Sequence, residues 1–203
     1  DAAGKTITLT YDHLDRVRET ENQNGKVSTI QYDLADRVIA RVDPLCNHTS
    51  FVFDALDRRT KIIDPDNKVT TFLHDKLGNL TGIIDPSGNR TTFVLDALNR
   101  VSSTQDPFDN GSTVGYDSAG RVISRIDRLG RVREFSYDRN GRITQETWRY
   151  IGSSTVHNTL SYSYDFRGNL VSAGDDDGTY SYTYDSLNRV ESVHGPFNVS
   201  LTF

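Results

Sequence analysis

The stretches Tyr116-Asp117-Ser118-Ala119-Gly120-Arg121 and Tyr137-Asp138-Arg139-Asn140-Gly141-Arg142 carry one motif twice, 21 residues apart. The motif is an aromatic or apolar residue, Asp, two variable residues, then Gly, Asn or Asp, and finally Arg or Asn. Along the 203 residues the steps between successive motif Asp residues are 21 six times, then 27, then 20. Equal steps of this length predict a tandem array of nine repeats. The other copies begin at Tyr11-Asp12, Tyr32-Asp33, Phe53-Asp54, His74-Asp75, Leu95-Asp96, Tyr164-Asp165 and Tyr184-Asp185.

The motif predicts a tight turn. Its Asp suits the first turn position, because the carboxylate can accept hydrogen bonds from backbone N–H groups two residues on. A hairpin loop built on a type I turn needs a residue that tolerates a left-handed backbone near its end. We therefore expect a positive φ at Asp15, Asp36, Asp57, Gly78, Asn99, Gly120, Gly141, Gly168 and Asn188. The next residue is Arg in seven copies and Asn79 or Asn169 in the other two.

A second turn lies between successive motifs. Pro presets the first torsion of such a turn, and Gly or Asn accepts the positive one. Each unit of 21 residues then holds two turns and two strands of about six residues. The second turn is clearest in Asp64-Pro65-Asp66-Asn67, Asp85-Pro86-Ser87-Gly88 and Asp106-Pro107-Phe108-Asp109-Asn110.

Apolar residues recur at fixed positions on both sides of each motif turn. With the motif Tyr they predict one consistently apolar sheet face, opposite a variable face. Open sheets of more than ~10 strands curl or split, so about 18 strands predict a curved, spiralling antiparallel β-meander of the all-β class. The positions before the motif are Leu9, Ile30, Phe51, Phe72, Phe93, Val114, Phe135, Tyr162 and Tyr182, and those after the turn include Val17, Val38, Arg59, Leu80, Val101, Val122, Ile143, Leu170 and Val190.

We expect residues 1–203 to form a single array cut from a longer chain. Asp1 to Lys5 match the register of the turn at residues 85–89, and Phe203 takes the place of Phe72 and Phe93. The array would thus start at a turn and stop inside a tenth hairpin. The unpaired edges beside Ile7 to Tyr11 and beside Glu191 to Val193 then predict self-association through edge strands.

The long step places an irregular insertion near residues 148–158, a Ser-rich stretch that contains the single Trp of the chain. We interpret it as a longer solvated hairpin loop, although insertions of this kind can also bind a ligand.

The composition excludes several protein classes. Hydrophobic residues are 35% of the chain, which predicts a sheet with little core. The net charge is −5 without any basic run, so nucleic acid is not an expected partner. No apolar stretch approaches the ~18 residues of a membrane span, and no signal-peptide pattern opens the sequence. The only Cys, Cys46, excludes an internal disulfide.

We expect no catalytic, cofactor-binding or metal-binding residue. The Asp and Arg columns recur in every repeat, whereas an active site occurs once. Stacked Asp–Arg pairs along the ribbon edge explain the columns, each worth ~0–1 kcal/mol when exposed. The run Asp175-Asp176-Asp177-Gly178 lacks the ligand spacing of an EF-hand and occupies a turn between motifs. Cys46 beside His48 is interpreted as an exposed, inert turn thiol and not as a thiolate nucleophile.

The pattern Tyr-Asp-x-x-Gly-Arg at a period of 21 residues resembles the YD repeats of the RHS family over essentially the whole chain. The family includes bacterial Rhs polymorphic toxins, the C components of Tc toxin complexes, wall-associated proteins and teneurins. The resemblance implies a spiralling β-sheet shell, which in the toxin members encloses a C-terminal toxic domain. Phe53, His74 and Leu95 depart from the family Tyr. The family's self-cleaving core segment has no counterpart here, so the resemblance concerns the wall and not its cargo.

Two functions remain open. The first is a structural wall segment of a shell that encapsulates a toxin or effector domain, with the remaining repeats of the parent chain and an encapsulated C-terminal toxin as partners. The alternative is an extracellular adhesion or carbohydrate-binding array of a cell-surface protein. An aromatic pocket on the variable face that holds a glycan would indicate the alternative. Both functions predict a secreted or cell-surface protein, and neither is enzymatic.

Overall fold

The computed structural model describes residues 6–196 and 199–202, so the expectations for residues 1–5 and for Phe203 lie outside the described residues. The described residues form nineteen short β-strands joined by turns, and none of them forms a helix long or apolar enough to cross a membrane. The strands are β1 Thr8–Tyr11, β2 Val17–Glu21, β3 Val27–Tyr32, β4 Val38–Val42, β5 His48–Phe53, β6 Arg59–Ile63, β7 Val69–His74, β8 Leu80–Ile84, β9 Arg90–Leu95, β10 Val101–Gln105, β11 Gly111–Tyr116, β12 Val122–Ile126, β13 Arg131–Tyr137, β14 Ile143–Tyr150, β15 Val156–Tyr164, β16 Leu170–Asp175, β17 Gly178–Tyr184, β18 Val190–His194 and β19 Ser200–Thr202.

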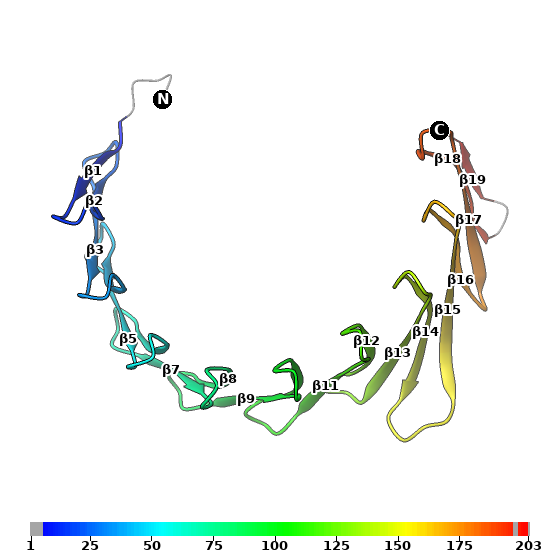
Figure 1. The fold of residues 1–203 in the computed structure, drawn as a ribbon, viewed down its shortest axis with the longest axis horizontal. Helices are drawn as coiled ribbons and strands as arrows, with labels where there is room; N and C mark the ends of the chain where they lie inside the picture. The colour runs from blue at the N-terminus through cyan, green and yellow to red at the C-terminus, as the bar shows by residue number, and fades with distance from the viewer. Residues whose placement is uncertain (1–5, 197–198, 203) are drawn as a thin grey trace. The chain divides into compact units, whose positions relative to one another are not determined.

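Every described strand pairs in antiparallel fashion with its neighbours in the sequence, which confirms the predicted all-β meander. The chain divides into two compact units, residues 1–93 and 94–203. Each unit, taken by itself, bends gradually along its strand order (Figure 1). The predicted curvature is therefore present within each unit, and the spiral of a longer array stays a prediction.

Both kinds of turn have the same five-residue geometry. In the motif turn, the Asp33 N–H donates to the Arg37 carbonyl at 3.0 Å, and the Asp36 N–H donates to the Asp33 carbonyl at 3.2 Å. The turn between motifs repeats this arrangement, with Asp43 in the first position and Cys46 in the fourth. Two turns of five residues, one strand of six and one of five account for the period of 21.

All nine residues predicted to have a positive φ have one, at values between 57° and 98°. One detail of the second turn differs from expectation. In the turn that begins at Asp106, the positive φ of 62° falls on Asp109 and not on an Asn. The run Asp175 to Gly178 lies in a turn between motifs, as predicted, and forms a tight hairpin in which Asp175 pairs directly with Gly178.

Each motif hairpin with a resolved register contains a β-bulge next to the motif aromatic, a feature that the sequence pattern did not predict. Tyr32 pairs with Val38 but Gln31 pairs with Ala40, so Ile39 is an extra residue. Val38 lies opposite Tyr32, so the predicted apolar position directly after the turn shares the face of the motif aromatic, and the bulge reverses the faces only of the residues that follow it. The bulged residues are Arg18, Ile39, Thr60, Thr81, Ile123, Thr144, Val171 and Glu191.

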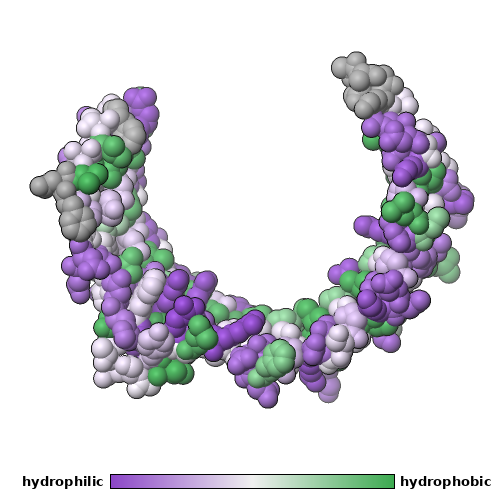
Figure 2. Space-filling model, turned by 180° about the vertical axis from the view of Figure 1, so that it is seen from behind, coloured by the Kyte–Doolittle hydropathy of each residue, from purple (hydrophilic) through white to green (hydrophobic). Residues whose placement is uncertain are grey.

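The sheet is a single layer with almost no enclosed core. Ala40 and Val132, each 3% exposed, are the buried hydrophobic residues of the described chain, and no large side chain is fully buried. Apolar residues form small patches among hydrophilic ones on the face shown in Figure 2. Contacts between successive repeats must therefore supply the stability that a core gives to a globular domain.

The insertion is mostly strand, which corrects its interpretation as a solvated loop. The strand β14 has eight residues and β15 has nine, while the other described strands have between three and seven. Residues 151–155 alone connect the two long strands. The longer hairpin thus places additional side chains on both sheet faces.

Candidate functional site

The motif Asp and Arg form an ion pair within one turn. The carboxylate of Asp117 accepts hydrogen bonds from the backbone N–H groups of Ala119 and Arg121, both at 2.9 Å. Its second oxygen accepts from Arg121 Nε at 2.7 Å. This geometry uses the whole carboxylate, because one oxygen holds the turn and the other holds the guanidinium in place.

The guanidinium of the motif Arg also contacts the next repeat. Arg121 lies over the ring of Tyr137 at 4.7 Å from the ring centroid, and it donates to the Asp138 carbonyl at 3.4 Å. In the opposite direction, the Tyr137 hydroxyl donates to the Val122 carbonyl at 2.6 Å. The Arg, held by the ion pair with its own Asp, and the following Tyr therefore join two repeats by a cation–π contact and two hydrogen bonds.

This Tyr–Asp–Arg ladder, as we call the repeated arrangement, is present in both units. The motif Arg also pairs with the turn of the next repeat in two copies, Arg16 with Asp36 and Arg37 with Asp57. The predicted stacking of Asp and Arg along the edge is thus one part of the ladder, and the pair inside each turn is the other. The Arg-to-ring contacts are Arg16 to Tyr32, Arg37 to Phe53, Arg100 to Tyr116, Arg121 to Tyr137 and Arg142 to Tyr164. The Tyr hydroxyl contacts are Tyr32 to Val17, Tyr116 to Val101, Tyr137 to Val122, Tyr164 to Ile143 and Tyr184 to Leu170.

The ladder lowers the pKa of its carboxyl groups. The hydrogen bond from the Arg16 side chain lowers the pKa of Asp12 from its ordinary value of 3.8 to about 2. The Arg37 and Arg100 side chains likewise lower the pKa values of Asp33 and Asp96. Where Asn replaces Arg, the Asn79 side chain has the same effect on the pKa of Asp75.

The remaining residues that the sequence singled out do not gather into a site. Among residues 6–196 and 199–202, no three His, Cys, Asp or Glu side chains are placed to hold a metal ion. Asp175 instead accepts hydrogen bonds from the Asn158 side chain, at 2.9 Å, and from the Asp177 N–H, at 3.0 Å. Cys46 is an exposed free thiol at the left-handed turn position, with a φ of 65°.

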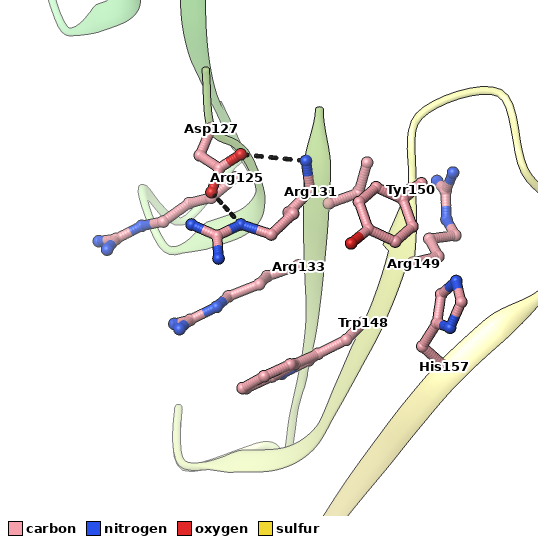
Figure 3. Close-up of a pocket in the computed structure, with 9 residues that line it drawn as sticks. Arg125, Asp127, Arg131, Arg133, Trp148, Arg149, Tyr150 and His157 are labelled. Carbon is pink, nitrogen blue, oxygen red and sulfur yellow. Dashed lines mark hydrogen bonds and ion pairs between the residues drawn. The ribbon is translucent and has the colours of Figure 1, made fainter. Parts of the chain in front are cut away.

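A second arrangement, which the sequence interpretation missed, lies on the strands β12 to β15. Here a concave site of about 570 Å³ is lined by Arg125, Arg133, Trp148 and Tyr150, among other residues. We call it the Arg–Trp site. The side chains of Arg125, Arg133 and Trp148 extend in the same direction from neighbouring strands (Figure 3). Cross-strand pairing explains this, because Arg125 lies opposite Arg133, which lies opposite Trp148.

The Arg–Trp site lies on the apolar face and not on the variable face. Arg133 alternates along β13 with Phe135 and Tyr137, so its side chain shares their face. One feature of the sequence could have indicated this site, namely the residue four positions before the motif aromatic, which is Arg133 in this repeat. That position is Ile7 in the first repeat and Ser or Thr in the five repeats that follow it, namely Ser28, Thr49, Thr70, Thr91 and Ser112.

Repeated five-residue turns along an antiparallel meander, joined by a repeated side-chain ladder, define a β-hairpin repeat protein. The RHS repeat family matches residues 53–89, 74–110 and 116–147. Residues 53–110 and 116–147 therefore match RHS repeats, as the motif predicted. No curated protein is similar to it in sequence.

Solved structures of Tc toxin components share the fold. The complex TcdB2-TccC3 without its hypervariable C-terminal region matches 94% of this chain with 13% identity and a TM-score of 0.62. The complex TcdB2-TccC3 matches 92% with 17% identity and a TM-score of 0.59. The Photorhabdus luminescens Tc holotoxin pore matches 92% with 17% identity and a TM-score of 0.54. This chain spans only 12–13% of the length of those chains, so the likeness concerns a segment of each.

Proposed function

We propose that this array is a wall segment of an RHS shell that encloses a toxin or effector domain of the same parent chain. The observation that carries the proposal is the Tyr–Asp–Arg ladder. Its Asp, Arg and Tyr groups are engaged with the neighbouring turn or repeat, for example in Arg142, which binds Asp138 at 2.6 Å and donates to the Asp165 carbonyl at 3.3 Å. Groups used in this way build a continuous sheet and are not available for catalysis. The array is therefore a structural element and not an enzyme.

The fold likeness to TcdB2-TccC3 supports the same function. A shell that holds a toxin acts outside the cell that produces it, so the protein is secreted or displayed at the cell surface. The remaining repeats of the parent chain and the enclosed domain are its partners.

Limited proteolysis of the full-length protein tests the wall function. We expect a domain beyond the repeats to resist protease in the native protein and to become cleavable when Arg121→Ala and Arg142→Ala weaken the ladder. The matched control is Arg139→Ala, which changes an exposed Arg in the same turn as Arg142. A domain that is cleaved equally in all three proteins, or a parent chain without any such domain, contradicts the proposal.

A second function, a carbohydrate-binding array of a cell-surface protein, is favoured by one observation, the Arg–Trp site, which lies on the apolar face and not on the variable face where such a pocket was expected. Its guanidinium and aromatic groups are not part of the ladder.

The isolated chain is also proposed to associate through its edge strands. Among the described residues, β1 pairs only with β2 and β19 pairs only with β18, so each has a free row of N–H and C=O groups. Sedimentation of the 203-residue chain over a concentration series should show a rising mass. A mass that stays that of a monomer at the highest concentration contradicts this proposal.

A further inference from the structure

The Arg–Trp site has the size and composition of a small-molecule site. Its volume of about 570 Å³ lies within the range of ~300–1,000 Å³ that ligand pockets occupy. It lies entirely within the second unit, on the strands β12 to β15, of which β14 and β15 are the long strands of the inserted hairpin. Its aromatic walls are Trp148 and Tyr150, which are 39% and 50% exposed. Exposed aromatic rings on an open sheet offer flat surfaces that another ring can cover.

The charges of the site leave one guanidinium unbalanced. Arg131 binds Asp127 at 2.6 Å, and Arg149 binds Glu134, whose pKa it lowers. Arg125 has neither an ion pair nor a hydrogen bond from its side chain within the described part of the chain, although the protein as a whole is acidic.

Arg133 is held in place but keeps free donors. Its Nε lies 3.5 Å from the Glu146 carboxylate, and its guanidinium lies over the Trp148 ring at 4.8 Å from the ring centroid. Glu146 also accepts a hydrogen bond from the Trp148 indole N–H at 2.7 Å. These contacts preorganise Arg133 and Trp148 without using all the guanidinium donors, which reduces the ordering cost of binding a ligand.

The remaining repeats provide a comparison within the same chain. Arg41 occupies the repeat position of Arg125, eight residues after the motif Asp. Its cross-strand partner is Thr49, whereas that of Arg125 is Arg133. A second Arg and a neighbouring Trp therefore distinguish the Arg–Trp site from the equivalent place in the first unit.

We propose that the Arg–Trp site binds an acidic saccharide with one carboxylate. The carboxylate lies between Arg125 and Arg133, because a guanidinium binds a carboxylate through two parallel N–H donors. The sugar ring covers the exposed faces of Trp148 and Tyr150. The single unbalanced charge fits a ligand with one negative charge. The nearby Glu146 and Asp127 carboxylates can accept hydrogen bonds from hydroxyl groups but repel a phosphate with two charges.

The inference rests on the second proposed function and is independent of the wall function, since one array can form a wall and bind a glycan. Its test uses the fluorescence of Trp148, the only Trp of the 203-residue chain. The probe is 3′-sialyllactose, and the uncharged control is lactose. We expect saturable quenching by 3′-sialyllactose and at least tenfold weaker binding of lactose.

Amino-acid substitutions distinguish binding at the Arg–Trp site from general electrostatic attraction to the protein. Loss of a hydrogen bond to a charged group costs about 1.5–3 kcal/mol, so Arg125→Gln or Arg133→Gln should weaken binding of 3′-sialyllactose roughly tenfold or more. The matched control Arg41→Gln removes the same charge from the equivalent position and should leave affinity unchanged. Calorimetry with Trp148→Ala, in which fluorescence is lost, should show at least a fivefold weaker affinity.

Three results overturn the inference. The first is no binding of 3′-sialyllactose by the native chain. The second is an equal loss of affinity in Arg41→Gln and Arg125→Gln, which would indicate charge alone. The third is tighter binding of inorganic phosphate, a nucleoside monophosphate or a Glu-rich peptide, which would assign the site to another ligand class. None of these results bears on the proteolysis test of the wall.

Discussion

The Tyr137 hydroxyl donates a hydrogen bond of 2.6 Å to the backbone carbonyl of Val122, which lies 15 residues earlier in the preceding repeat. The same ring lies under the Arg121 guanidinium. A single side chain thus makes two different contacts with the neighbouring repeat. Since the described sheet has almost no core, such contacts should determine how strongly one repeat holds the next.

Tyr137→Phe should lower the free energy of unfolding by about 0.5–1.5 kcal/mol, because it removes the hydroxyl bond and keeps the ring under Arg121. Phe53 already occupies the equivalent place over which Arg37 lies, so the fold accepts the change. Urea unfolding checks the prediction. The control is Tyr180→Phe, whose hydroxyl has no hydrogen bond within the described residues. Equal losses in the two variants would argue against a role for the hydroxyl.

Arg142→Lys should lower the midpoint of thermal unfolding by several degrees, whereas Arg139→Lys in the same turn should not. The Arg142 guanidinium binds Asp138 through two nitrogens and lies over Tyr164 at 4.5 Å from the ring centroid. A Lys ammonium cannot reproduce this planar, two-pronged contact. Calorimetric unfolding of both variants is the measurement. Similar midpoints would mean that the ladder requires only a positive charge.

Gly141→Val should destabilise the chain by about 1–3 kcal/mol, since a β-branched residue is strained at the φ of 80° found there. The space around Gly141 is open, with the nearest atom 4.0 Å from an added Cβ, so strain and not a clash is the cause. Ser136→Val is the control, because Ser136 is an exposed strand residue where Val is tolerated. Equal thermal shifts would show that the turn register does not matter.

The array should lose stability in acid. The ladder lowers the pKa of Asp12, Asp33 and Asp96 in the folded chain. Their contribution is therefore fully present above the unfolded value of 3.8 and is lost as the pH falls through the folded value, about 2 for Asp12. Unfolding midpoints measured from about pH 7 to about pH 2 should fall mainly in this window.

Asp96→Asn provides the control for the acid effect. The Asn keeps an oxygen that can accept the turn hydrogen bonds, but it cannot titrate. We expect this variant to be less stable than the native chain at neutral pH and to show a weaker loss of stability below pH 3.8. A native-like pH dependence would assign the acid effect to other carboxyl groups.

Much of the fold followed from local chemistry. A residue with a positive φ can be identified from the sequence because few residue types accept that backbone, and all nine such positions in the motif turns are confirmed. The number and order of the hairpins could likewise be predicted from the 21-residue period. The bulge was missed because its residue can be Arg, Ile, Thr, Val or Glu, which leaves no signature in the sequence.

The contacts between repeats could be identified only from the tertiary structure. The sequence placed Tyr, Asp and Arg in columns, but only the sheet register shows that Arg121 pairs with its own Asp117 and covers the next Tyr137. The Arg–Trp site depends even more on the tertiary structure. Arg125 and Trp148 lie on β12 and β14, and only the pairing of both strands with β13 brings their side chains together. Turn chemistry acts between residues within reach of one another along the chain, so the sequence alone determines it. Which side chains meet across strands depends on register and on a bulge or a longer hairpin, and only the folded sheet decides it.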